Sequence, residues 1–226
     1  MKLHLENELA TREDIPGAVL LVEAKVLAEL VVSERLRSCL EIGVANGASA
    51  LALAQAVSEI DGSLEGIDPC QLNEHGAAAV KLLERFGLAS RFLLHPHPTH
   101  LIGPKLLEAG RKFDLVFIDG MHNFEFKSLD GFYSDRLLRV GGLLALHDAT
   151  FQSTKKVIKL LMTTGRFEMV ETPSLHLTLG RKMRRLIGAI ARGRTYSFFW
   201  PNGFANMVVL RKRSEDEVSW DFFRNF

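Results

Sequence analysis

The stretch that decides the fold is RSCLEIGVANGAS, residues 37–49. A short apolar run ends at Gly43, a second glycine follows at Gly47, and residues 48–57 have the composition of a helix. This succession predicts a strand, a tight glycine turn and a helix. Such a turn brings backbone N–H groups and the positive end of a helix dipole to one point, which favours binding of a carboxylate or phosphate.

The spacing of the two glycines argues against a dinucleotide. A dinucleotide turn has the pattern G-x-G-x-x-G, whereas this turn is G-x-x-x-G with an acid two residues before it. Glu-x-Gly-x-x-x-Gly-x-Ser resembles the first motif of class I S-adenosylmethionine-dependent methyltransferases, which implies S-adenosylmethionine as cofactor. The alternative is a generic strand-to-helix turn in another α/β protein. By resemblance, the cofactor-binding residues of this turn are Glu41, Gly43, Ala45, Asn46, Gly47 and Ser49.

Length and composition indicate one ordinary globular domain over residues 1–226, with an N-terminal helical segment over 1–36. The chain is 47% hydrophobic and 24% charged, and its net charge of +1 makes nucleic acid an unexpected partner. Two cysteines and the absence of a secretory leader pattern predict a cytoplasmic protein. The apolar run of residues 15–32 is interrupted by charges, so it predicts an amphipathic helix instead of a membrane span.

Strands and helices alternate along the chain, which predicts a doubly wound, mostly parallel α/β sheet with ligands at the carboxyl ends of its strands. The resemblance implies the seven-stranded Rossmann-like methyltransferase sheet, whose last strand is antiparallel. After the first strand, we expect strands over 62–69, 91–94, 113–120, 143–148, 167–171 and 207–210, helices over 16–33, 48–57, 71–87, 123–138 and 154–162, and a turn at 140–142.

The second strand ends in Asp68 and Pro69. In a βαβ unit this end lies beside the first glycine turn, where a carboxylate can accept both ribose hydroxyls. The alternative is a solvated aspartate before a turn. The loop HPHPTH, residues 95–100, has three histidines but neither cysteine nor carboxylate, so we do not expect a metal there. In the proposed fold it flanks the adenine, with Pro98 and Thr99 as lining residues.

Polar residues also end the fourth and fifth strands. FDLVFIDGMH ends in Asp119 and His122, and LLRVGGLLALHD ends in His147 and Asp148. Neighbouring strands lie about 4.8 Å apart, so these side chains should converge beside the cofactor turn. Both stretches resemble the O-methyltransferase branch of class I, including its catechol-type members.

That resemblance implies a magnesium site at Asp119, His147 and Asp148, with Asp119 also beside the cofactor. The ion would lower the pKa of an acceptor hydroxyl. His147 departs from the pattern, because a hard cation prefers oxygen, so it shifts the preference to a transition metal or replaces the ion as a base. The candidate catalytic residues are therefore His122, His147 and Asp148. The alternatives are a helix-capping aspartate and ordinary hydrogen-bonded histidines.

The segment 172–206 is a basic insertion between the last two strands, with its basic residues at 181–194. It could form a lid over an anionic acceptor, bind a membrane surface or partner, or be a solvated face. We expect O-methylation of a small hydroxyl compound. RNA or protein methylation, and cofactor binding without turnover, are the alternatives. The sequence leaves acceptor identity and homo-oligomerisation open.

Overall fold

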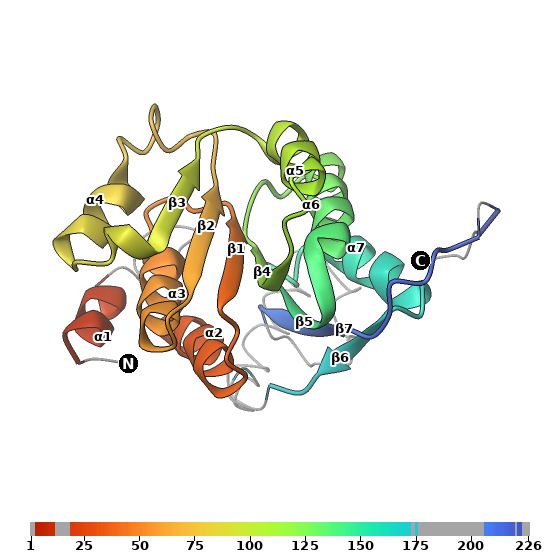
Figure 1. The fold of residues 1–226 in the computed structure, drawn as a ribbon, viewed down its shortest axis with the longest axis horizontal. Coiled ribbons are helices and arrows are strands. Elements are labelled where there is room, and N and C mark those ends of the chain that lie inside the picture. The colour runs from red at the N-terminus through yellow and green to blue at the C-terminus, as the bar shows by residue number, and fades with distance from the viewer. Residues whose placement is uncertain (1–2, 12–18, 173–174, 176–205, 220, 223–226) are drawn as a thin grey trace, which may run out of the picture.

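The computed structural model describes residues 3–11, 19–172, 175, 206–219 and 221–222. Within these residues, seven strands form one sheet in the order β3-β2-β1-β4-β5-β7-β6 (Figure 1). Neighbours among β1 to β5 pair in parallel, and β7 is antiparallel to both β5 and β6. The strands are β1 (Ser38–Ile42), β2 (Ser63–Ile67), β3 (Phe92–His95), β4 (Phe113–Ile118), β5 (Leu138–Leu146), β6 (Phe167–Val170) and β7 (Val208–Lys212). This is the Rossmann-like sheet that the sequence predicts.

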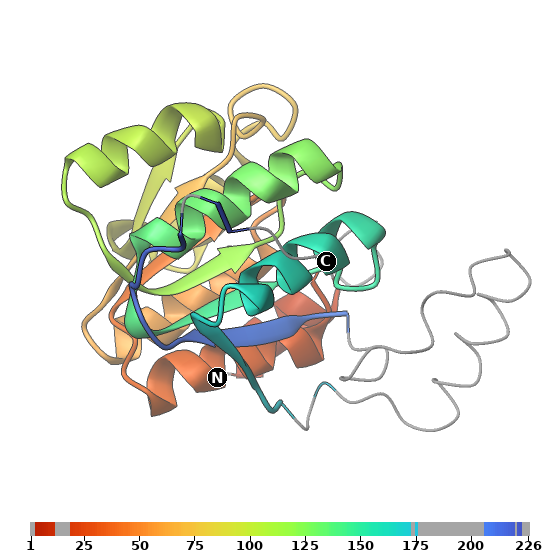
Figure 2. The same cartoon turned by 90° about the vertical axis from the view of Figure 1, so that its right-hand side faces the viewer.

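Helices cover both faces of the sheet (Figure 2). One apolar core lies between the sheet and α2, α3 and α4, and a second lies between the sheet and α5, α6 and α7. None of the helices in the described part of the chain is both long and apolar enough to cross a membrane. The helices are α1 (Leu3–Ala10), α2 (Leu21–Ser33), α3 (Ala48–Glu59), α4 (Ala78–Arg85), α5 (Thr99–Glu108), α6 (Phe124–Leu137) and α7 (Gln152–Thr163), with a short 3-10 turn η1 (Ala89–Arg91).

Strand β4 shows why the sheet is buried on both faces. Successive side chains of a strand point to opposite faces. Leu115 and Phe117 accordingly lie in the first core, whereas Val116 and Ile118 lie in the second, and all four are fully buried. A near-continuous apolar run is therefore what this position requires.

Three predicted boundaries are wrong. The helix predicted over 16–33 begins at Leu21, because Leu20 is extended and caps it, and residues 12–18 lie outside the described part. The helix predicted over 71–87 begins at Ala78, because the buried Gln71 side chain folds back toward the glycine turn. Residues 140–142 are not a turn but part of β5, whose pairing with β4 shifts register nearby, as in a bulge.

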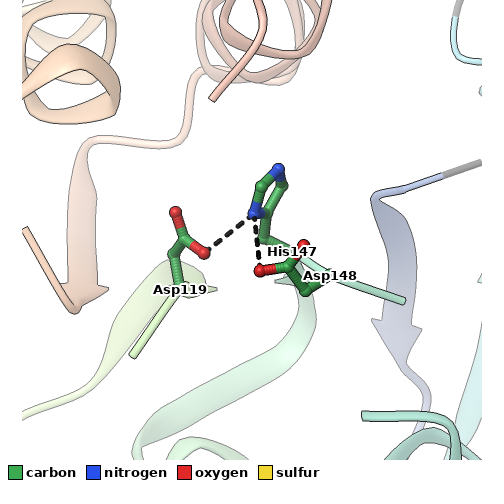
Figure 3. A group of neighbouring side chains, drawn as sticks. All are labelled: Asp119, His147 and Asp148. Atoms are coloured by element: carbon green, nitrogen blue, oxygen red, sulfur yellow. Dashed lines mark hydrogen bonds and ion pairs between the residues drawn. The ribbon is translucent and has the colours of Figure 1, made fainter. Parts of the chain in front are cut away.

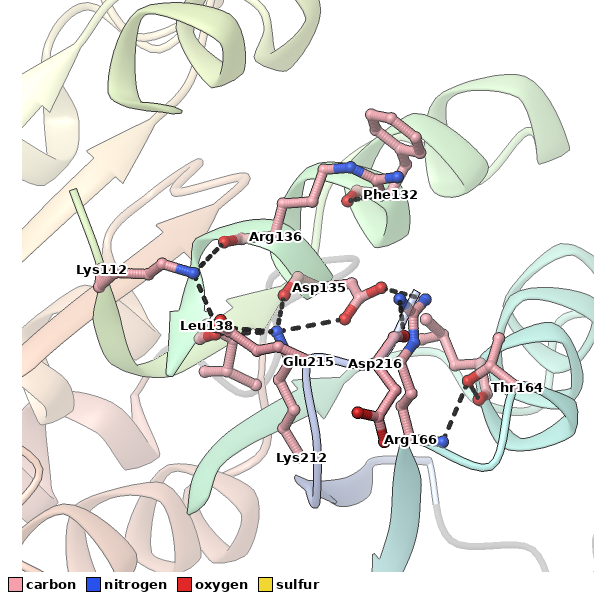
Figure 4. Close-up of polar contacts among 11 residues, drawn as sticks. Lys112, Phe132, Asp135, Arg136, Leu138, Thr164, Arg166, Lys212, Glu215 and Asp216 are labelled. Atoms are coloured by element: carbon pink, nitrogen blue, oxygen red, sulfur yellow. Dashed lines mark hydrogen bonds and ion pairs between the residues drawn. The ribbon is translucent and has the colours of Figure 1, made fainter. Parts of the chain in front are cut away.

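A buried ionic cluster fixes β7 at the opposite end of β5 from the strand tips (Figure 4). Lys212 is 3% exposed, and its Nζ donates to the backbone oxygens of Asp135, at 2.5 Å, and Leu138, at 3.1 Å. Arg166 Nη2 donates to Asp135 Oδ2 at 2.5 Å. These contacts tie the last two strands to the end of α6, so β7 completes the sheet beside β5. The insertion proposed as a lid lies outside the described residues, apart from 172, 175 and 206.

Candidate active site

Four parallel strands end in one row across the sheet. The last residues of β2, β1, β4 and β5 pair in register with their neighbours. The residues that follow these strands are Asp68, Gly43, Asp119 and His147. They therefore lie side by side at the carboxyl edge, where open α/β sheets bind their ligands.

The turn after β1 requires glycine at its first position. Gly43 has a φ of +88°, and a Cβ there would lie 2.5 Å from the backbone oxygen of Asp119 and 2.6 Å from the Cα of Gly120. Gly47 has a φ of +81°, and a Cβ there would lie 2.8 Å from the Cα of Ala79. The two glycines thus let the turn lie directly against β4 and α4. Ala45, between them, is exposed, and Asn46 is half-buried.

Asp68 braces this turn. Its Oδ2 accepts hydrogen bonds from the backbone N–H groups of Val44, at 3.0 Å, and Ala45, at 2.7 Å. Its Oδ1 accepts one from the N–H of Cys70 at 2.8 Å, which leaves acceptor capacity on that oxygen. Gln71, which the sequence analysis missed because it placed residue 71 in a helix, donates to the backbone oxygen of Ala45 at 2.5 Å. The predicted proximity of Asp68 to the turn is confirmed.

Glu41 lies beneath the turn and is fully buried. Its Oε1 accepts a hydrogen bond from the Ser49 hydroxyl, whereas no described residue bonds to its Oε2. Burial raises the pKa of Glu41 well above its ordinary value, although the Ser49 hydrogen bond opposes this. An unpaired buried oxygen under a turn that only glycine can form suits a ligand with hydrogen-bond donors.

The remaining predicted cofactor residues lie after β2 and at the start of α5. Pro69 is exposed next to Asp68. Pro98 directly precedes α5, and Thr99, the first residue of that helix, is 7% exposed and bonds to Asp130. Of the loop histidines, His95 pairs through Nε2 with Glu65 Oε2 at 2.7 Å.

The strand tips of β4 and β5 bring three predicted residues together (Figure 3). One potential ligand atom from each of Asp119, His147 and Asp148 lies within 4.8 Å of the others. His147 Nδ1 is 2.8 Å from Asp119 Oδ1 and 3.6 Å from Asp148 Oδ2. The predicted convergence is therefore confirmed, and both carboxylates approach the same ring nitrogen.

Carboxylates face both nitrogens of the His147 ring, which is 2% exposed. Nε2 lies 3.1 Å from Glu23 Oε2 of α2. Burial alone would lower the pKa of His147, but hydrogen bonds to Asp119, Asp148 and Glu23 outweigh it and raise the pKa to about 12. The three carboxylates therefore favour the protonated form of His147.

His122 lies at the outer side of this group. Its ring is stacked on Phe151 with centroids 5.0 Å apart, and its Nδ1 is 3.4 Å from Asp148 Oδ2. The His122 side chain is 47% exposed, in contrast to His147. Burial would raise the pKa of Asp148, but the nearby His147 outweighs it and lowers that pKa. Asp148 thus connects a buried histidine to one that solutes can reach.

Four residues around these tips could not be predicted from the sequence. Glu23 contacts His147 from α2. Asn206 Nδ2 lies 3.1 Å from the same ring nitrogen, His147 Nε2, and donates to Asp148 Oδ1 at 3.2 Å. Lys127 is fully buried with an Nζ that no described residue bonds, and Asp130 is 3% exposed beside Gly120. No local pattern marks these residues, because each looks like an ordinary charged or polar position of a helix or loop.

One protein family matches the part of the chain that holds the site. The sequence model of a family described as "Methyltransferase domain" matches residues 40–149, which hold the glycine turn, Asp68 and the strand tips. Residues 40–149 therefore match a methyltransferase domain, and the sheet has the strand order of the class I S-adenosylmethionine-dependent methyltransferase fold. No curated protein sequence matches it significantly.

Solved structures share the methyltransferase fold over almost the whole chain. The O-methyltransferase TomG from Streptomyces achromogenes, in complex with S-adenosylmethionine, is 19% identical with a TM-score of 0.66, over 95% of this chain and 91% of that one. An O-methyltransferase from Bacillus cereus, in complex with S-adenosylhomocysteine, is 16% identical with a TM-score of 0.68, over 94% and 92%. An S-adenosylhomocysteine-bound methyltransferase from Podospora anserina is 16% identical with a TM-score of 0.63, over 94% and 87%.

Proposed function

We propose that this methyltransferase transfers the methyl group of S-adenosylmethionine to a hydroxyl of a small molecule. The observation that carries the proposal is the row of strand ends, because it sets the glycine turn beside Asp119, His147 and Asp148. A cofactor on the turn and a hydroxyl at the tips of β4 and β5 would then be neighbours. Residues 1–226 act as one domain in this proposal.

The cofactor would lie along the glycine turn. The N-terminal end of α3 and the unpaired Glu41 Oε2 are suited to the charged amino-acid end of the cofactor. The remaining acceptor capacity of Asp68 Oδ1 is suited to the ribose hydroxyls. The start of α5 would line the adenine pocket. The proposed cofactor-binding residues are Glu41, Gly43, Ala45, Asn46, Gly47, Ser49, Asp68, Pro69, Pro98, Thr99 and Asp119.

Methyl transfer to oxygen is an in-line displacement, so the protein must orient the hydroxyl and accept its proton. His122 is the residue that we assign as the base, because it is accessible and Asp148 lies 3.4 Å from its Nδ1. Asp148 would hold the hydroxyl beside the cofactor, and His147, buried between Asp119 and Glu23, would hold the carboxylates of the strand tips in place.

A divalent ion is compatible with these residues. Asp119, His147 and Asp148 offer one imidazole and two carboxylate ligands, a set that suits manganese, iron or zinc better than magnesium. Glu23 on the second ring nitrogen is the usual support of a metal-bound histidine. Such an ion would acidify an acceptor hydroxyl, and its binding would displace the Nδ1 proton.

The experiment is methyl transfer from radiolabelled S-adenosylmethionine to a panel of phenolic, sugar and anionic hydroxyl compounds, with and without a chelator. We expect product with at least one acceptor, a loss of about 10²–10⁴-fold in His122→Ala, and normal rates in His100→Ala, an exposed histidine on α5. Transfer to RNA or protein alone, or cofactor binding without any transfer, would contradict the proposal. Activity that survives chelation but not His122→Ala would reject its metal-assisted form.

A further inference from the structure

Glu23 is an unusual residue for the first turn of a helix, because it is buried. Glu23 is the third residue of α2 and forms a capping box with Leu20. A capping acid can accept its hydrogen bond while exposed to solvent, yet Glu23 is only 3% exposed. Burying a carboxylate is costly unless it is paired. Helix α2 already packs through apolar side chains such as Ala24 and Leu27, so packing does not require an acid there.

One oxygen of Glu23 makes two contacts. Oε2 accepts a hydrogen bond from the backbone N–H of Leu20 at 2.9 Å and lies 3.1 Å from Nε2 of His147. The first contact closes the start of α2 and is local, because it joins residues three positions apart. The second joins residues 124 positions apart. Glu23 also lies outside the 40–149 segment that matches the family.

We propose that Glu23 is a positioning residue that accepts the Nε2 hydrogen of His147 and thereby directs Nδ1 toward Asp119 and Asp148. A flipped ring would place carbon atoms against the Glu23 carboxylate and forfeit this hydrogen bond. With the ring held, Nδ1 stays 2.8 Å from Asp119 Oδ1. The proposal rests on the proposed function of these strand tips, and it holds whether Nδ1 carries a proton or an ion.

Three variants separate orientation from helix capping. Glu23→Met removes the carboxylate but fills its space. Glu23→Gln keeps a neutral oxygen that can accept the same hydrogen. Leu20→Pro is the control, because it removes the capping N–H at a residue whose φ of −66° suits proline and leaves Glu23 facing His147.

Two readouts are measured on each protein. The first is the Nε2–H resonance of His147 in long-range ¹H–¹⁵N spectra, assigned by its absence in His147→Gln. The second is kcat with an acceptor that the enzyme methylates, together with the Kd for S-adenosylhomocysteine. Glu23→Met should lose the protected resonance and lower kcat about 10–100-fold while the Kd stays within about twofold, as expected for loss of a supporting carboxylate.

In Glu23→Gln the resonance should remain but move upfield, because a neutral acceptor makes a weaker hydrogen bond, and most of kcat should return. Leu20→Pro should keep both signals. An unchanged resonance in Glu23→Met or Glu23→Gln overturns the proposal, as does an equal loss of kcat in Leu20→Pro. The spectra can be recorded without any methyl transfer. If the chain methylates no hydroxyl, the proposed function is refuted, and the spectra still test the role of Glu23.

Discussion

The glycine turn gives the sharpest quantitative prediction, because Gly43 has a matched control in Gly141. Both have a left-handed backbone, with φ of +88° and +84°. Placing alanine in that region costs about 1–2 kcal/mol at either position. A Cβ at Gly141 meets nothing within 4 Å, whereas at Gly43 it would meet three backbone atoms of the two residues after β4 at 2.5–2.6 Å. Relief of that overlap costs about a further 1–3 kcal/mol.

Urea unfolding should therefore show that the unfolding free energy falls by about 1–2 kcal/mol in Gly141→Ala and by about 2–5 kcal/mol in Gly43→Ala. Calorimetry with S-adenosylhomocysteine should show wild-type affinity for Gly141→Ala. Gly43→Ala should bind at least about tenfold more weakly, since a small displacement in a preorganised site is costly. Equal losses of stability, or unchanged affinity in Gly43→Ala, would refute the close approach of this turn to β4.

Three more predictions concern buried charged groups. Asp68→Ala leaves two turn amides without their acceptor, so unfolding free energy should fall by about 1–3 kcal/mol and S-adenosylhomocysteine affinity should drop, by urea unfolding and calorimetry. Burial would raise the pKa of Glu65, but hydrogen bonds from His95 and Arg111 outweigh it and lower that pKa. At pH values above 4.5, the ordinary pKa of a glutamate, the ionised carboxylate therefore stabilises the fold. Urea unfolding at a series of pH values should show that Glu65→Gln has a lower unfolding free energy than the unchanged protein at pH 7, and that this difference shrinks as the pH falls below 4.5. Lys127→Met removes a buried amino group to which no described residue forms a hydrogen bond. The unfolding free energy, measured with urea, should therefore rise by about 1–2 kcal/mol. A fall would show that nearby acids already compensate the charge.

The elements that sequence predicts well are those with local causes. The turn at Gly43, the acid at Asp68 and the polar tips at Asp119 and Asp148 follow from glycine spacing and from apolar runs that end in polar residues. A parallel sheet then places such ends at one edge, because its connections run through helices. For this reason the parallel α/β sheet and the convergence of the strand tips are predictable from the sequence, and the seven-stranded arrangement follows from the resemblance to methyltransferases.

The support of those tips could not be predicted, because it comes from contacts between distant segments. Glu23 looks like a solvated charge of an amphipathic helix, and Asn206 is the last residue of a long basic insertion. Only the packing of α2 and the start of β7 beside β5 brings them to His147. Gln71 was assigned to a helix because nothing in its own neighbourhood shows that its side chain folds back to Ala45.

The central claim is that cofactor and acceptor share the carboxyl edge of β1, β2, β4 and β5. A crystal structure of the chain with S-adenosylhomocysteine tests it most directly. We predict density along the turn from Gly43 to Gly47, with ribose hydroxyls at Asp68 and the sulfur facing Asp119 and His147. Density elsewhere on the molecule, or a ligand whose sulfur faces away from these strand tips, would contradict the claim.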